Sequence, residues 1–149
     1  MNKIRLSKKK GILFWITGFS GSGKTTISKK IKNNIVKKYG PTITISGDNI
    51  RKIFQLNKFD KKSRLDAAIK YSNLCKLLTD QRINVIFSVN GLIHKLRKYN
   101  RKNIKNYIEI YIESEIKKLI KNSKKKHYRE KSKFIWGVDL KPELPKKPH

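Results

Sequence analysis

Short apolar runs and helical apolar stripes alternate along this chain. Residues 12–17 form a continuous apolar run of strand length, which predicts a strand buried on both faces, as in a parallel sheet. An apolar stripe of helical spacing follows in residues 25–38, made of Ile27, Ile31 and Ile35. This stripe predicts a helix that ends near Gly40. A glycine-rich turn joins the two segments, so strand, turn and helix come in the order that a phosphate-binding loop requires.

The rest of the chain continues the alternation. Runs of β-branched or apolar residues predict further strands at residues 42–46, 83–89 and 107–112. Helical spacing predicts further helices at residues 63–79, 93–101 and 115–122. The proline-containing tail at 140–149 can form neither a regular helix nor a central strand. This order predicts one α/β domain over residues 1–149, with helices on both faces of a mainly parallel sheet.

The glycine turn matches the pattern G-x-x-x-x-G-K-[ST]. Its glycines allow a tight turn with inward-facing N–H groups, and the helix that begins at Lys24 adds the positive end of its dipole. We expect Lys24 to reach the β- and γ-phosphates of ATP and the Thr25 hydroxyl to bind Mg²⁺. The motif predicts a three-layer αβα fold of the P-loop NTPase type. The expected ATP-binding residues are Gly18, Phe19, Ser20, Gly21, Ser22, Gly23, Lys24, Thr25 and Thr26.

Asp48 directly follows the strand predicted at residues 42–46, at the sheet edge where open α/β folds bind ligands. The strand predicted at 83–89 does not end in an aspartate, so Asp48 is the candidate for organising Mg²⁺ or orienting an acceptor hydroxyl. A second interpretation stays open, because Gly-Asp-Asn is also typical of a turn or a helix cap. Arg51 and Arg64 are, on the same grounds, either solvated cations or anion-binding groups.

The composition adds one strong signal, a formal net charge of +28 from 38 Lys+Arg and 10 Asp+Glu. Such a charge attracts polyanions in general. The lysines are scattered and not interleaved with aromatic residues, which favours a solvated basic surface over a nucleic-acid face. The apolar runs are too short for a membrane span or a secretory signal. The single cysteine, Cys75, fits a core position, a chain without disulfides and a cytoplasmic protein.

Taken together, these motifs resemble adenylylsulfate kinase, the family that phosphorylates the 3′-hydroxyl of adenosine 5′-phosphosulfate (APS) with ATP. The resemblance covers the glycine turn, then Gly47-Asp48-Asn49-Ile50-Arg51, Phe59 and Arg64, and finally Trp136-Gly137-Val138-Asp139. It implies a homodimeric kinase in which Asp48 serves the acceptor hydroxyl and Mg²⁺. It also implies that Arg51 and Arg64 hold the anionic APS and that Phe59 stacks on its adenine, roles that suit arginine and aromatic side chains.

Several positions depart from that family's pattern. Ser46 stands where the family has Asp, and Ala67 stands where it has Asn. Gly91-Leu92 replace a Ser-Pro pair, Asn122-Ser123 replace Arg-Asp, and the lid-like segment at 124–136 is short. Most of these changes concern the acceptor side of the site. Two alternatives to an APS kinase therefore remain, a kinase for another small hydroxyl acceptor and a nucleotide-binding protein without turnover.

Overall fold

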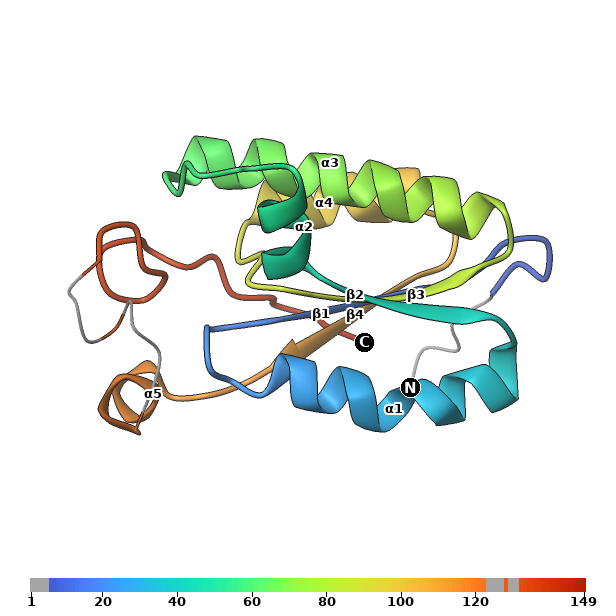
Figure 1. Ribbon diagram of the computed structural model, residues 1–149, viewed down its shortest axis with the longest axis horizontal. Coiled ribbons are helices and arrows are strands. Elements are labelled where there is room, and N and C mark those ends of the chain that lie inside the picture. Colours follow the sequence, from blue (N-terminus) through green and yellow to red (C-terminus); the bar gives the residue numbers. More distant parts are fainter. Residues whose placement is uncertain (1–5, 123–127, 129–131) are drawn as a thin grey trace.

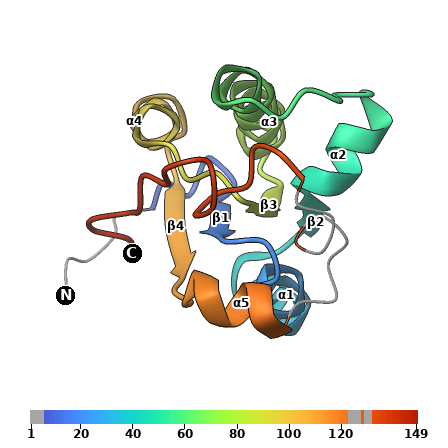
Figure 2. The same cartoon turned by 90° about the vertical axis from the view of Figure 1, so that its left-hand side faces the viewer.

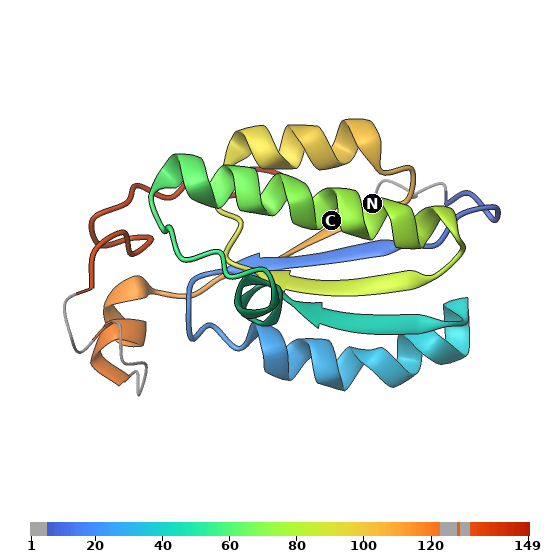
Figure 3. The same ribbon diagram turned by 45° about the horizontal axis from the view of Figure 1, so that its top comes forward.

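Four parallel strands form one sheet in the order β2-β3-β1-β4 (Figure 1). The computed structural model describes residues 6–122, 128 and 132–149. The strands are β1 (Leu13–Gly18), β2 (Thr42–Ser46), β3 (Asn84–Val89) and β4 (Tyr107–Ile112). Because all pairs are parallel, the carboxyl ends of the strands meet at one edge of the sheet, where α1 and α2 also begin (Figure 3).

Helices cover both faces of this sheet (Figure 2). The helices are α1 (Lys24–Tyr39), α2 (Gly47–Ile53), α3 (Lys61–Asp80), α4 (His94–Asn103) and α5 (Ile116–Asn122). The views agree that α2, α3 and α4 lie on one face and α1 and α5 on the other. This is the three-layer α/β arrangement that the sequence predicts. In the described part of the chain, none of the helices is long and apolar enough to cross a membrane.

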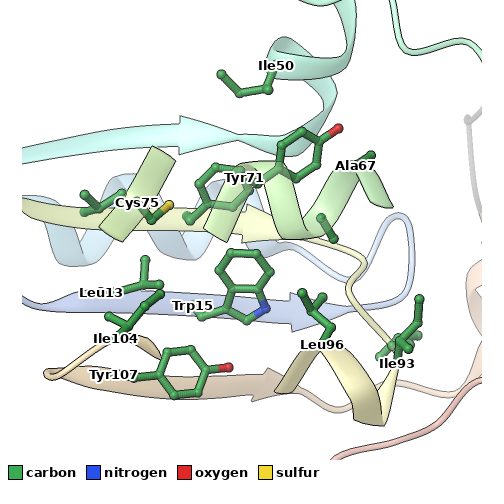
Figure 4. Close-up of a cluster of buried hydrophobic side chains, with 14 of the residues drawn as sticks. Leu13, Trp15, Ile50, Ala67, Tyr71, Cys75, Ile93, Leu96, Ile104 and Tyr107 are labelled. Atoms are coloured by element: carbon green, nitrogen blue, oxygen red, sulfur yellow. The ribbon is translucent and has the colours of Figure 1, made fainter. Parts of the chain in front are cut away.

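Strand β1 is buried on both faces, as its continuous apolar run predicts. Leu13 and Trp15 belong to the apolar cluster under α3 and α4 (Figure 4), whereas Phe14 and Ile16 belong to a second cluster with Ile35 of α1. Successive side chains of a strand point to opposite faces, so one run supplies both cores. Cys75 is fully buried in the first cluster, which confirms its interpretation as a core residue.

The eight predicted strands and helices form with ends within two residues of the predicted ones. Helix α2 is the exception, because the sequence indicated only a turn or a cap at Gly47-Asp48-Asn49. Ser46 begins this helix by accepting a hydrogen bond from the Asn49 backbone N–H at 3.2 Å, so the cap is Ser46 and Asp48 lies in the first turn. The predicted lid-like segment at 124–136 lies outside the described residues except for Tyr128 and residues 132–136.

Candidate active site

The phosphate loop joins β1 to α1, and the Lys24 side chain folds back over the backbone of this loop. Gly23 precedes the helix at φ +90°, a left-handed conformation that favours glycine. Lys24 Nζ donates hydrogen bonds to the carbonyl oxygens of Gly18 at 3.1 Å and Phe19 at 2.6 Å. The lysine therefore bridges the start of the loop and the start of the helix, and its ammonium lies beside the N–H groups that would face a phosphate.

A cavity of about 290 Å³ opens in front of this loop, at the carboxyl ends of the strands. From the loop and α1 it is lined by Ser20, Gly21, Gly23, Lys24, Thr25 and Thr26. The rest of its lining comes from β2, α2, α3 and the segment at the end of β3, and includes Asp48, Arg51, Arg64, Tyr71 and Asn90. The structure thus brings the predicted catalytic pair, Lys24 and Asp48, to the walls of one cavity.

A second cavity of about 610 Å³ adjoins the first. It is lined by Phe59 and by side chains near the carboxyl terminus, including Tyr128 and Phe134. The two cavities share Ser20, Asp48, Arg51, Arg64, Asn90 and Trp136. A ligand in the second cavity can therefore contact Asp48, which also lines the space in front of the phosphate loop.

Two arginines and two aromatic rings form the boundary between the cavities. The guanidinium carbon of Arg51 lies 4.4 Å from the centre of the Phe59 ring, and that of Arg64 lies 5.3 Å from Phe59 and 5.7 Å from Trp136. Such distances are those of cation–π contacts. Burial and the charge of Arg51 lower the pKa of Arg64 to about 10, so it stays charged at neutral pH. Two cations held this close favour an anionic ligand between or beside them.

Local hydrogen bonds fix the segment that carries Phe59 and Arg64. Asp60 caps α3 by accepting from the Ser63 N–H at 3.0 Å and from the Ser63 hydroxyl at 2.6 Å. Arg64 donates through Nε to the Phe59 carbonyl at 2.5 Å and through Nη2 to the Phe134 carbonyl at 2.7 Å. Arg64 therefore ties the start of α3 to the carboxyl-terminal segment that closes the second cavity.

The positions that depart from the adenylylsulfate kinase pattern lie in different environments. Ser46 and Gly91 line the first cavity, whereas Ala67 is buried in the core and lines neither cavity. Sequence reasoning missed Tyr71 and Asn90, which line the first cavity. Neither residue is part of a motif, but Asn90 directly follows β3 at the sheet edge that made Asp48 a candidate, whereas Tyr71 reaches the site only through the packing of α3. Among the described residues, groups of three His, Cys, Asp or Glu that could hold a metal ion are absent.

The fold and the site define a P-loop kinase, in which the loop and a carboxylate line one cavity together with two arginines. The sequence model of the adenylylsulphate kinase family matches residues 10–149, and the chain belongs to this family. It is an ATP-dependent phosphotransferase, as its family and its named relatives are kinases.

Two relatives carry different names. A cytidine diphosphoramidate kinase of Campylobacter jejuni is 34% identical over 142 residues, which cover 93% of this chain and 84% of the relative. An adenylyl-sulfate kinase of Clostridium acetobutylicum is 30% identical over 155 residues, which cover 99% of this chain and 76% of the relative. The fold is also that of the Mycobacterium tuberculosis APS kinase solved with AMPPNP and APS. That similarity has a TM-score of 0.83 over 93% of this chain and 86% of the other, at 22% identity.

Proposed function

We propose that this kinase transfers the γ-phosphoryl group of ATP to a ribose hydroxyl of a small nucleotide whose 5′ phosphate is linked to a second small polar group. The position of Asp48 carries this proposal. Asp48 lines both cavities, the first together with the phosphate loop and both of them together with Arg51 and Arg64. A hydroxyl at Asp48 would face the phosphate of ATP, while the anionic end of the same molecule would meet the arginines.

The residues of the phosphate loop, Gly18 to Thr26, would hold the ATP phosphates. Lys24 would exchange its two loop carbonyls for the β- and γ-phosphate oxygens and stabilise charge on the group in transfer. Thr25 and Asp48 line the first cavity and carry the oxygen ligands that Mg²⁺ prefers, so they would hold the ion. When bound, Mg²⁺ neutralises charge on the phosphates. Asp48 would accept a hydrogen bond from the acceptor hydroxyl and orient it for attack.

Phe59, Arg51 and Arg64 would bind the acceptor. The Phe59 ring lines the second cavity and is 45% exposed, so a nucleobase can stack on it. The two guanidiniums present donors in a fork that suits phosphate-like oxygens. A stacked base, an anionic 5′ end and a hydroxyl near Asp48 together describe a nucleotide more closely than a sugar or a peptide.

Among nucleotides of this kind, we favour cytidine diphosphoramidate as the acceptor. It is the substrate named for the Campylobacter relative, which is 34% identical to this chain. The changes away from the adenylylsulfate kinase pattern at Ser46 and Gly91 also line the first cavity, together with Asp48 and Arg51. APS is the second candidate, since Gly47-Asp48-Asn49-Ile50-Arg51 follows its kinases' pattern and the Clostridium relative is named for it.

A coupled ADP-release assay with ATP and Mg²⁺ tests this proposal. It compares cytidine diphosphoramidate, APS, cytidine diphosphate and a blank without acceptor. We expect kcat/KM for cytidine diphosphoramidate to exceed that for APS by about tenfold or more, which corresponds to ~1.4 kcal/mol of discrimination. Faster turnover of APS would make the protein an adenylylsulfate kinase. ADP release that none of the nucleotides accelerates would overturn the proposed function.

A further inference from the structure

Tyr71 lies where the apolar core meets the first cavity. Its ring stacks on Phe87 at 5.5 Å between centroids, and Phe87 stacks in turn on Trp15 at 5.0 Å. The residue is 3% exposed, yet it lines the first cavity together with Arg51, Arg64 and Asn90. Figure 4 shows its hydroxyl directed from α3 toward the α2 side of the cluster. The ring thus belongs to the core, and the hydroxyl belongs to the wall of the site.

By strict geometry neither this hydroxyl nor Arg51 Nε has a hydrogen-bond partner in the described part of the chain, but the hydroxyl lies within hydrogen-bonding reach of the Arg51 side chain. Because the two side chains are neighbours, the charge of Arg51 and its contact with the hydroxyl oppose the rise of the Tyr71 pKa that burial causes. A buried polar group without a partner costs roughly 1–3 kcal/mol. Phenylalanine would fill the same space on Phe87 without that cost, so packing alone does not explain a tyrosine here.

The groups around the Tyr71 hydroxyl indicate what it would bind. Arg51 and Arg64 place two positive charges on the same cavity wall, and the Asn90 side chain adds polar atoms. Burial raises the pKa of Tyr71, which keeps the hydroxyl protonated and able to donate at neutral pH. Two donors without a partner of good geometry, Tyr71 Oη and Arg51 Nε, therefore share a wall that attracts an anion.

We infer that Tyr71 is a specificity-determining residue whose hydroxyl, beside Arg51 Nε, donates a hydrogen bond to the anionic 5′ end of the acceptor nucleotide. This inference rests on the proposed function, since it assigns one end of the proposed acceptor to this wall. It adds a neutral donor to the two arginines. A neutral donor also suits an end group that carries less charge than a full phosphate, such as an amidated or sulfated phosphate.

The test substitutes Tyr71→Phe and measures binding by titration calorimetry on enzyme saturated with Mg²⁺ and AMPPNP, which occupies the phosphate loop. The probes are cytidine diphosphoramidate, APS and inorganic pyrophosphate as an anion without a nucleoside. We expect the Kd of pyrophosphate and of the accepted nucleotide to rise about tenfold, the usual scale for a hydrogen bond to a charged group. The KM for ATP should stay unchanged, and the melting temperature should be equal or higher.

Tyr107→Phe is the matched control. The Tyr107 hydroxyl is also buried and, among the described residues, has no hydrogen-bond partner of good geometry, since it lies only within reach of Asn100; Tyr107 lines neither cavity. This variant should bind all three probes as the parent does. If Tyr71→Phe leaves the Kd of a turned-over acceptor within about twofold of the parent, the inference is wrong and the proposed function stands. If pyrophosphate binding depends on Tyr71 but neither nucleotide is phosphorylated, the inference stands and the proposed acceptor is wrong.

Discussion

Substitution of Lys24 by alanine tests two roles of this residue, one in catalysis and one in the architecture of the loop. In the structure, Lys24 Nζ donates to the carbonyls of Gly18 and Phe19, so the side chain holds the loop closed on itself before ATP binds. With ATP bound, the same ammonium is expected to contact the β- and γ-phosphates. Lys24→Ala removes both functions, and each has its own measurable consequence.

The two consequences differ in size. Loss of a preorganised donor from a developing charge typically lowers kcat by about 10²–10³-fold, or roughly 2.7–4 kcal/mol. Loss of two charge-assisted hydrogen bonds at a partly exposed site should cost about 1–3 kcal/mol of folding stability, because water replaces part of what is lost. Catalysis should therefore suffer more than stability, and Lys24→Arg should restore stability better than rate, since its planar fork cannot reproduce a point charge.

The rate is measured as acceptor-dependent ADP release, and stability as urea unfolding of the free enzyme. Lys30→Ala is the control, because Lys30 is exposed on the same helix and lines neither cavity. It should leave the rate unchanged. A Lys24→Ala rate within about tenfold of the parent, a barrier change of only ~1.4 kcal/mol, would refute the role given to this lysine.

Three further predictions concern other parts of the site and its supports. Asp48→Asn should lower kcat by about 10²-fold or more and leave the affinity for ATP unchanged. Single-turnover kinetics measure the rate, and nucleotide titration measures the affinity. Lost ATP binding would assign Asp48 to the metal alone. Gly137→Ala should lower the free energy of unfolding by about 1–3 kcal/mol. The reason is that φ of residue 137 is +83° and the new Cβ would come within 3.0 Å of Phe19. An unchanged midpoint of urea unfolding would contradict this. Glu143 accepts a hydrogen bond from Lys61 at 2.7 Å, which lowers its pKa below the usual 4.5. The parent should therefore be more stable than Glu143→Gln at neutral pH and lose that advantage as the pH falls below the usual 4.5 and through the lowered pKa, whereas a constant difference would contradict the pairing.

Much of this fold could be predicted because its signals are local. The isoleucine stripe of α1 and the continuous apolar run of β1 depend only on which residues face the two cores. Helix α2 was missed for a local reason as well. Its seven residues are too few to show a periodic stripe, and the cap at Ser46 is as typical of a turn as of a helix.

The acceptor side could be predicted only in part, because it is assembled from distant segments. Asp48 and Arg64 belong to recognisable motifs, and the structure brings both to the shared boundary of the cavities. Trp136 reaches the same boundary through a turn at Gly137, which packs against Phe19. Tyr71 lies among the apolar positions of α3, so the sequence indicates only a core residue. Its hydroxyl reaches a cavity because of how α3 packs on the sheet.

The most direct test of the account follows the γ-phosphoryl group itself. Purified enzyme is incubated with γ-labelled ATP, Mg²⁺ and either cytidine diphosphoramidate or APS, and the labelled products are separated and identified by mass spectrometry. We expect label on a ribose hydroxyl of cytidine diphosphoramidate, and loss of that product in Lys24→Ala. Label recovered only as inorganic phosphate, with either acceptor unchanged, would contradict it.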